Sequence, residues 1–204
     1  MRENITIGII GAGGDGVVVL GKLLQKLAAT QGYFSQMSMY YGPQIRGGGS
    51  AVKLSLDSQR PSLPRDSLDI LVCFNWERYL EFSKELSLET DSLVLYDSNL
   101  SGKVSLPENS FQANFSQKSE EATGTPLNKN IVALGLLLGV LGFPEEQRQK
   151  AIGQDGALAL LKSNAPALQA GKDMLPQFHL PELNLAPALE RSTKTILHGN
   201  VAIA

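Results

Sequence analysis

Residues 5–16 read ITIGIIGAGGDG, and this stretch decides how the chain is expected to fold. Its first half, residues 5–10, is rich in β-branched residues and predicts a buried strand. Its second half, residues 11–16, fits the pattern G-x-G-x-x-G. Apolar residues then recur at helical spacing over residues 16–29. A strand, a glycine-rich turn and a helix in this order predict the first unit of an α/β domain.

The rest of the chain continues this alternation. A helix is expected after Phe74, because Asn75 can cap the segment WERYLEFSKEL. A very apolar helix is expected over residues 126–141, and residues 102–125 look irregular with some strand character near 111–115. Further strands are predicted over residues 34–39, 50–56, 68–74 and 92–96. The sequence thus predicts a three-layer, Rossmann-like α/β domain with a mostly parallel sheet.

Composition excludes several classes of function. The chain has 204 residues and a formal net charge of −2, which argues against a nucleic-acid or anionic-membrane partner. Its single cysteine, Cys73, forms no intrachain disulfide, and no Cys/His cluster has the spacing of a metal site. No long apolar segment precedes the first glycines, so we expect no signal peptide and a cytoplasmic location.

Two explanations fit the first glycine loop. Gly11, Gly13, Gly14 and Gly16 would let an anion approach the N-terminus of the following helix, or they would only allow strand and helix to pack closely. A dinucleotide site also needs an acidic residue about 20 residues further on. The sequence places SMYY there, and residues 16–52 contain no acidic side chain. A nicotinamide or flavin site therefore lacks its second anchor.

A thiamine site is also not indicated. The triplet Gly14-Asp15-Gly16 resembles the GDG metal motif of thiamine diphosphate enzymes, whose pattern continues with paired asparagines some 25 to 30 residues later. Residues 38–46 read SMYYGPQIR and contain no asparagine. Thiamine binding by this route is therefore excluded.

A second glycine-rich loop surrounds a lone arginine. Arg46 follows a Gly-Pro turn and precedes three glycines, in the run YGPQIRGGG over residues 41–49. The planar guanidinium suits phosphate or carboxylate, and flanking glycines let a ligand or another chain touch the backbone. Alternatively, Arg46 pairs with a surface carboxylate and the glycines form a bulge at the start of a strand.

Together the two loops resemble a known family. G-x-G-G-x-G near the N-terminus and Y-G-P-x-x-R-G-G about 25 residues later are similar to the gamma subunit of 2-oxoacid:ferredoxin (or acceptor) oxidoreductases, the pyruvate/ketoisovalerate/2-oxoglutarate family. Residues 68–72, LDILV, and residues 130–135, NIVALG, resemble later motifs of the same family. The resemblance covers roughly residues 5–170, and one departure is Asp15, where the family usually has glutamine. An acid there is expected to repel phosphate.

The resemblance implies a division of labour. The intact enzyme would oxidatively decarboxylate a 2-oxoacid to acyl-CoA. Thiamine diphosphate, Mg and iron–sulfur clusters would be bound by alpha and beta partners. Ferredoxin or a similar acceptor would receive the electrons. This chain would be an accessory component without catalytic residues that helps to hold coenzyme A. The implied contact residues are Gly11, Gly13, Gly14, Gly16, Tyr41, Gly42, Pro43, Arg46, Gly47, Gly48 and Asn130.

Three segments are expected along the chain. Residues 1–174 form the gamma-type domain, residues 175–192 form a proline-bearing linker, and residues 193–204 begin a following alpha-type domain or add a terminal strand. The stretch GNVA at 199–202 resembles the opening of an alpha domain fused behind the gamma domain. Two alternatives stay open for the whole chain: a stand-alone Rossmann oxidoreductase that binds a nucleotide, and a purely structural interaction domain.

Overall fold

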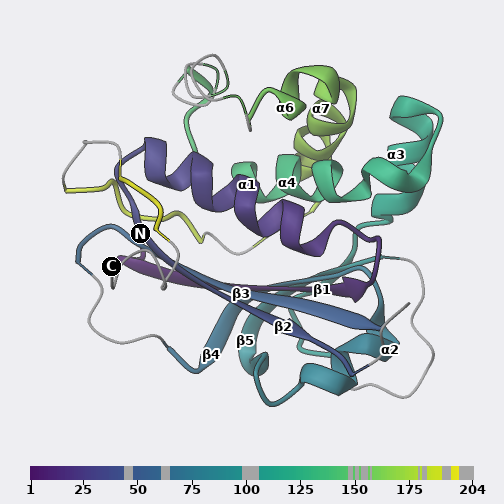
Figure 1. Cartoon of the computed structure of the whole chain (residues 1–204), viewed down its shortest axis with the longest axis horizontal. Helices are drawn as coiled ribbons and strands as arrows, with labels where there is room; N and C mark the ends of the chain where they lie inside the picture. The colour runs from purple at the N-terminus through teal and green to yellow at the C-terminus, as the bar shows by residue number, and fades with distance from the viewer. Residues whose placement is uncertain are drawn as a thin grey trace.

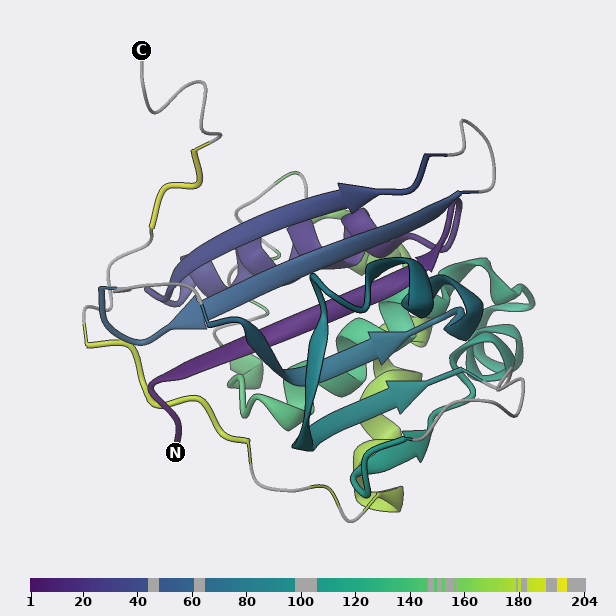
Figure 2. The ribbon, with the colours of Figure 1, turned by 90° about the horizontal axis from the view of Figure 1, so that it is seen from below.

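A computed structural model describes residues 1–43, 48–60, 65–97, 106–146, 149, 152, 156, 158–178, 180, 183–189 and 194–197. Within this part of the chain, six strands form one sheet in the order β2-β3-β1-β4-β5-β6 (Figure 2). The strands are β1 (Asn4–Ala12), β2 (Phe34–Tyr41), β3 (Gly49–Asp57), β4 (Ser67–Cys73), β5 (Ser87–Tyr96) and β6 (Ser110–Gln112). The pairs β1–β4, β4–β5 and β5–β6 are parallel, and only β3 runs against its neighbours. The predicted α/β fold with a mostly parallel sheet is confirmed.

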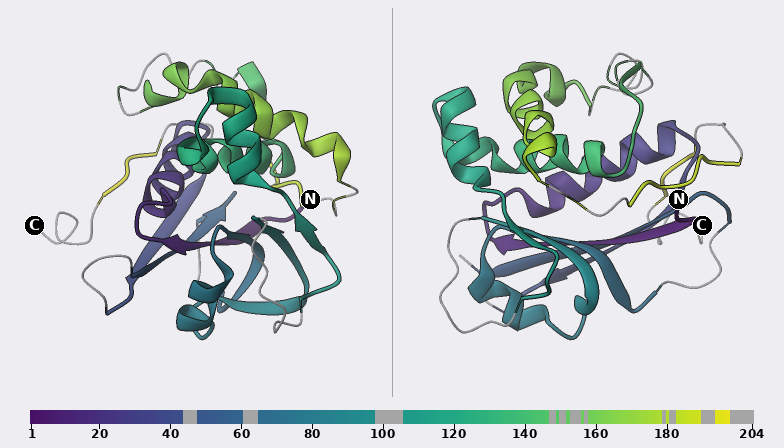
Figure 3. Two further views of the ribbon diagram at one scale, coloured as in Figure 1. Left: turned by 90° about the vertical axis from the view of Figure 1, so that its right-hand side faces the viewer. Right: turned by 180° about the vertical axis from the view of Figure 1, so that it is seen from behind.

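Helices cover the two faces of the sheet unequally. The long helices lie together on one face, and the short α2 and η1 lie on the other, so the third layer is thin (Figures 1 and 3). The helices of the thick layer are α1 (Val17–Thr30), α3 (Phe115–Thr123), α4 (Lys129–Val140), α6 (Leu160–Ser163) and α7 (Ala165–Asp173). The thin layer has α2 (Trp76–Tyr79) and η1 (Leu80–Phe82), and two further 3-10 turns are η2 (Pro126–Asn128) and η3 (Leu175–Gln177).

The first strand is buried on both faces, as its near-continuous apolar run predicts. Ile5, Ile7 and Ile9 are fully buried and belong to the core under the long helices. Ile10 belongs to a second, smaller core with Cys73 and Trp76 under α2 and η1. Burial raises the pKa of the Cys73 thiol, so this group stays protonated and is no candidate nucleophile.

Two glycines allow α4 and α7 to cross at close range. A Cβ built on Gly135 would lie 2.2 Å from the backbone oxygen of Leu168, and one on Gly171 would lie 1.9 Å from the backbone oxygen of Val132. Neither obstacle is a side chain that can rotate away. Gly135 is the last residue of the NIVALG stretch, so this position is required by helix packing.

The segment expected to form one helix after Asn75 is much shorter than predicted. Asn75 does cap it, because its side-chain oxygen accepts a hydrogen bond of 3.3 Å from the backbone N–H of Arg78. However, α2 ends at Tyr79 and continues only as the 3-10 turn η1. The buried side chains are Trp76, Tyr79 and Phe82, and their spacing of three matches the 3-10 period. Tertiary packing therefore overrides the propensity for a longer α-helix.

The region expected to be irregular contains the helix α3. The helix is polar, and only Phe115 and Ser119 are buried, so it has no amphipathic pattern to detect. Its N-terminus is held by the buried Asp97, whose carboxylate accepts hydrogen bonds from both the backbone N–H and the hydroxyl of Ser116. Asp97 lies at the end of β5, so this cap is a tertiary contact. β5 also begins at Ser87, five residues before the predicted start at Ser92.

The described part of the C-terminal segment lies against the domain. Leu185 forms a parallel bridge with Arg2, and the backbone N–H of Leu189 donates to the oxygen of Ser58 at 3.1 Å. The backbone N–H of Lys194 donates to the oxygen of Ala29 at 2.8 Å, and the described residues 194–197 carry no strand. None of the described helices combines the length and apolarity that crossing a bilayer requires.

Candidate functional site

The sheet brings the two predicted glycine loops together. The first loop follows β1 and the second connects β2 with β3, and the register pairs Ala12 at the end of β1 with Gly49 at the start of β3. The backbone N–H of Gly13 donates to the oxygen of Gly48 at 2.9 Å, which joins the two loops directly. The backbone N–H of Gly42 donates to the oxygen of Gly49 at 2.9 Å and closes the base of the second loop.

An open hollow of about 490 Å³ lies between the loops and the start of α1. Six glycines, three valines, one tyrosine and one serine line it, so none of its described lining residues carries a charged side chain: Gly13, Gly14, Gly16, Val17, Val18, Val19, Tyr41, Gly42, Gly48, Gly49 and Ser50. The predicted residues Gly13, Gly14, Gly16, Tyr41, Gly42 and Gly48 therefore share one surface. Pro43 is described but is not part of this lining, whereas Arg46 and Gly47 lie outside the described residues.

Gly16 and Asn130 form a packing contact behind the hollow. Gly16 has φ 75° and ψ 20°, a left-handed conformation that favours glycine. A Cβ on Gly16 would also lie 2.4 Å from the side-chain nitrogen of Asn130, which is buried at the start of α4. For Gly16 the explanation by close packing therefore holds.

Asp15 makes two polar contacts within the protein. One carboxylate oxygen accepts a hydrogen bond of 2.7 Å from the backbone N–H of Ala12, and the other pairs with Lys129 at 2.8 Å. Both side chains are only 17% exposed. A Cβ on Gly11 would lie 2.7 Å from the carboxylate, so Gly11 makes room for this turn. Lys129 compensates the negative charge that was expected to repel phosphate.

The backbone donors of the first loop are largely used within the protein. The N–H of Ala12 serves Asp15, the N–H of Gly13 serves Gly48, and the N–H of Asp15 donates to the oxygen of Ala12 at 3.1 Å. An anion cradle needs such donors to point at the ligand. The described surface of the hollow therefore suits contact with apolar groups and with backbone better than it suits a bare phosphate.

Side chains of α2 and η1 pack against the end of the second loop, a contact that was not predicted. A Cβ on Gly49 would lie 2.6 Å from a carboxylate oxygen of Glu81 and 2.7 Å from the ring of Phe82. Glu81 forms an ion pair with Arg78. These residues lie on α2 and η1, so only the folded chain shows that Gly49 leaves room for them.

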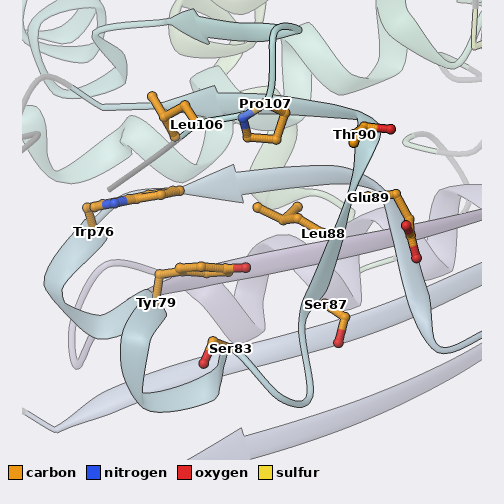
Figure 4. A pocket seen from close by; sticks show the side chains of 9 residues that line it. All are labelled: Trp76, Tyr79, Ser83, Ser87, Leu88, Glu89, Thr90, Leu106 and Pro107. Atoms are coloured by element: carbon orange, nitrogen blue, oxygen red, sulfur yellow. The ribbon is translucent and has the colours of Figure 1, made fainter. Parts of the chain in front are cut away.

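A second hollow of about 490 Å³ lies on the other face of the sheet, between η1, the start of β5 and Pro107 (Figure 4). Trp76 and Tyr79 stack there with ring centroids 4.8 Å apart, and the hydroxyl of Tyr79 donates to the oxygen of Leu86 at 3.1 Å. The indole N–H of Trp76 is buried and has no hydrogen-bond partner among the residues that the structure describes. This hollow contains none of the predicted site residues, and its aromatic pair serves the second core.

Two glycine loops meet at one end of a Rossmann-like sheet, and the described surface between them has no charged side chain, so a ligand or a partner chain can approach the backbone closely. The chain belongs to the family described as pyruvate ferredoxin/flavodoxin oxidoreductase, whose model matches residues 6–174. The resemblance to 2-oxoacid oxidoreductases is thereby confirmed. The comparisons lend no support to the alternative of a stand-alone nucleotide-binding oxidoreductase.

Curated relatives are subunits of such enzymes. The chain is 30% identical over 180 residues to ketoisovalerate oxidoreductase subunit VorA of Methanothermobacter marburgensis, with 84% of this chain and 36% of the relative covered. It is 28% identical over 180 residues to 2-oxoglutarate synthase subunit KorC of Archaeoglobus fulgidus, with 85% and 89% covered. The chain thus spans about a third of VorA but most of KorC.

Solved structures share the fold. One is a 2-oxoglutarate:ferredoxin oxidoreductase from Magnetococcus marinus with 2-oxoglutarate, coenzyme A and succinyl-CoA bound. The match covers 94% of this chain and 34% of the chain of that structure, with a TM-score of 0.74 and 21% sequence identity. The gamma subunit of a keto/oxoacid ferredoxin oxidoreductase from Geobacter sulfurreducens matches 85% of this chain and 99% of its own with a TM-score of 0.66 at 25% identity.

Proposed function

We propose that this chain is the gamma component of a 2-oxoacid:ferredoxin or acceptor oxidoreductase that converts a 2-oxoacid to acyl-CoA in the cytoplasm. Thiamine diphosphate, Mg and iron–sulfur clusters belong to alpha and beta partners in this proposal, and ferredoxin or a similar acceptor receives the electrons. The observation that carries it is the hydrogen bond between Gly13 and Gly48, which joins the two family motifs at one hollow whose described lining has no charged side chain. This hollow is the proposed contact site for the partners.

The described residues do not fit thiamine diphosphate, because the acid of the GDG triplet is occupied by Lys129 and Ala12. The chain therefore has no proposed catalytic step of its own. Its role is to position and cover groups that partner domains carry.

Coenzyme A is the ligand that the hollow would help to hold. The described lining supplies backbone and apolar surface for the body of the ligand, but no cation for its phosphates. In this proposal Arg46 supplies that charge, and Gly47 lets the phosphate approach the backbone. Gly11, Gly14, Pro43 and the remaining motif residues shape the loops.

We expect Arg46→Ala to weaken coenzyme A binding by about 1.5–3 kcal/mol, the range for a hydrogen bond to a charged group. Isothermal titration calorimetry with coenzyme A measures the affinity of each variant. Arg60→Ala is the matched control, because Arg60 is an exposed arginine outside the loops. Unchanged affinity in Arg46→Ala, or no affinity in the wild type, would reject a direct role for Arg46. In the second case the loops would be subunit contacts only.

Partner contact has its own test. Gly13 lines the hollow and is exposed, so Gly13→Val would place a branched side chain between the loops and a docked partner. Co-purification with the catalytic subunits should be lost in Gly13→Val, and Gly47→Val should act in the same direction. Gly156→Val is the control, because nothing lies within 4 Å of a Cβ built there. Equal recovery of partners by all variants would count against the assigned surface.

We also propose that the gamma-type domain extends over residues 1–174, and that residues 193–204 begin an alpha-type domain fused behind it. The difference in coverage between VorA and KorC supports this organisation, because the same domain occurs within a longer chain and as most of a short one. Sequencing the native gene beyond codon 204 tests it.

A further inference from the structure

The outer edge of β2 is long and pairs with no described strand, and Lys194 lies over the ring of its first residue, Phe34, at 4.4 Å. β2 is the terminal strand on its side of the sheet and has eight residues, FSQMSMYY, none of them charged and none a proline (Figure 2). At the other end of the sheet, β6 has only three residues. Soluble proteins usually blunt long edges with charges, prolines or a covering segment, because the free backbone groups otherwise pair with another strand.

An apolar surface adjoins this edge near the site. Met37 packs into the core under the helices, so Met39 and Tyr41, which alternate with it, lie on the same face of β2. The hydroxyl of Tyr41 lies 3.6 Å from the sulfur of Met39, and Tyr41 lines the same hollow as Val19 of α1. Val19, Met39 and Tyr41 are 42%, 37% and 65% exposed. Exposed aromatic and methionine side chains of this kind are typical of interface centres.

The charged residues of α1 are both lysines. Lys22 follows Val19 by one helical turn and is exposed. No acidic residue occurs anywhere in residues 16–52. A second copy of this chain would bring two Lys22 side chains toward each other, whereas a partner with an acidic side chain would be attracted.

We propose that β2 accepts an extended segment of a partner polypeptide as a seventh strand of the sheet. Backbone hydrogen bonds to the edge of β2 supply affinity, apolar side chains of the partner cover Val19, Met39 and Tyr41, and an acidic side chain of the partner lies near Lys22. The partner is a catalytic subunit or domain, so the inference rests on the proposed function and adds the mode of docking.

Hydrogen–deuterium exchange of the assembled complex and of the isolated chain tests this without mutation. Amides of β2 should exchange more slowly in the complex, while amides of β6 at the opposite edge should change little. Assembly with unchanged exchange in β2 overturns the docking mode but leaves the gamma-component proposal standing. Failure of the wild-type chain to assemble with the catalytic subunits overturns both.

A matched pair of variants tests the apolar anchor. Met39→Glu should weaken the affinity of the chain for the catalytic subunits by about 30-fold, the size of a hot-spot loss. Leu160→Glu is the control, because Leu160 on α6 is exposed to a similar extent, 43%. Equal affinities of the two variants would overturn the assignment. Protection of β2 in the isolated chain that rises with its concentration would also overturn it and would favour pairing between two copies.

Discussion

Gly135→Ala should lower the free energy of unfolding by about 3 kcal/mol or more, the cost of an unrelieved overpacking contact in a core. The added methyl carbon would lie 2.2 Å from the backbone oxygen of Leu168, so α4 and α7 must separate. Their separation would open the core under the long helices. Urea unfolding followed by circular dichroism measures the loss.

Gly139→Ala on the same helix is the matched control. Its Cβ would meet only the side-chain end of Leu175, at 2.8 Å, which can rotate away. In a helix interior, alanine is otherwise preferred to glycine by about 1 kcal/mol. A small effect at Gly139 with a large loss at Gly135 supports the close crossing of α4 and α7. Equal effects at the two positions would contradict it.

Asp15→Ala should lower the free energy of unfolding by about 2–4 kcal/mol, because it removes the partner of a largely buried cation and leaves a backbone donor unsatisfied. Lys129 and the N–H of Ala12 are the groups left without Asp15. The same variant should also loosen the first glycine loop and its bond to Gly48. Denaturant unfolding at neutral pH measures the change.

A double-mutant cycle separates the pair from the loop. Asp15→Ala combined with Lys129→Met should recover part of the loss, since the unpaired cation is then absent. Glu121→Ala is the control, because it breaks the exposed pair with Lys118 and should leave stability nearly unchanged. A loss in Asp15→Ala no larger than in Glu121→Ala would show that the Asp15–Lys129 pair contributes little.

The sheet was predictable from local patterns. β1 is a near-continuous apolar run, whereas in β3 the apolar Val52, Leu54 and Leu56 alternate with Lys53 and Ser55. The helix α3 was not predictable, because its cap comes from Asp97, which follows β5, and its sequence is polar. The early end of α2 could not be predicted from the sequence either, because it depends on how Trp76 and Tyr79 pack in the second core.

The site was predictable as a set of residues but not as an arrangement. The two glycine motifs were recognisable, yet the bond between Gly13 and Gly48 depends on the pairing of β1 with β3. Lys129 was missed, although it directly precedes the recognised Asn130, because a lysine at the start of a helix gives no local sign of its partner. The motif residues also have different roles, because Asn130 packs against Gly16 whereas Gly13, Gly16 and Gly48 line the hollow.

The most direct test of the account is turnover of a 2-oxoacid with a dye acceptor, with coenzyme A, thiamine diphosphate and Mg present. The measurement compares this chain alone, its catalytic subunits alone, and the two combined. An accessory gamma component predicts no turnover by the chain alone and a coenzyme A-dependent gain when it joins the catalytic subunits. Turnover by the chain alone, or full activity of the catalytic subunits without it, would contradict the account.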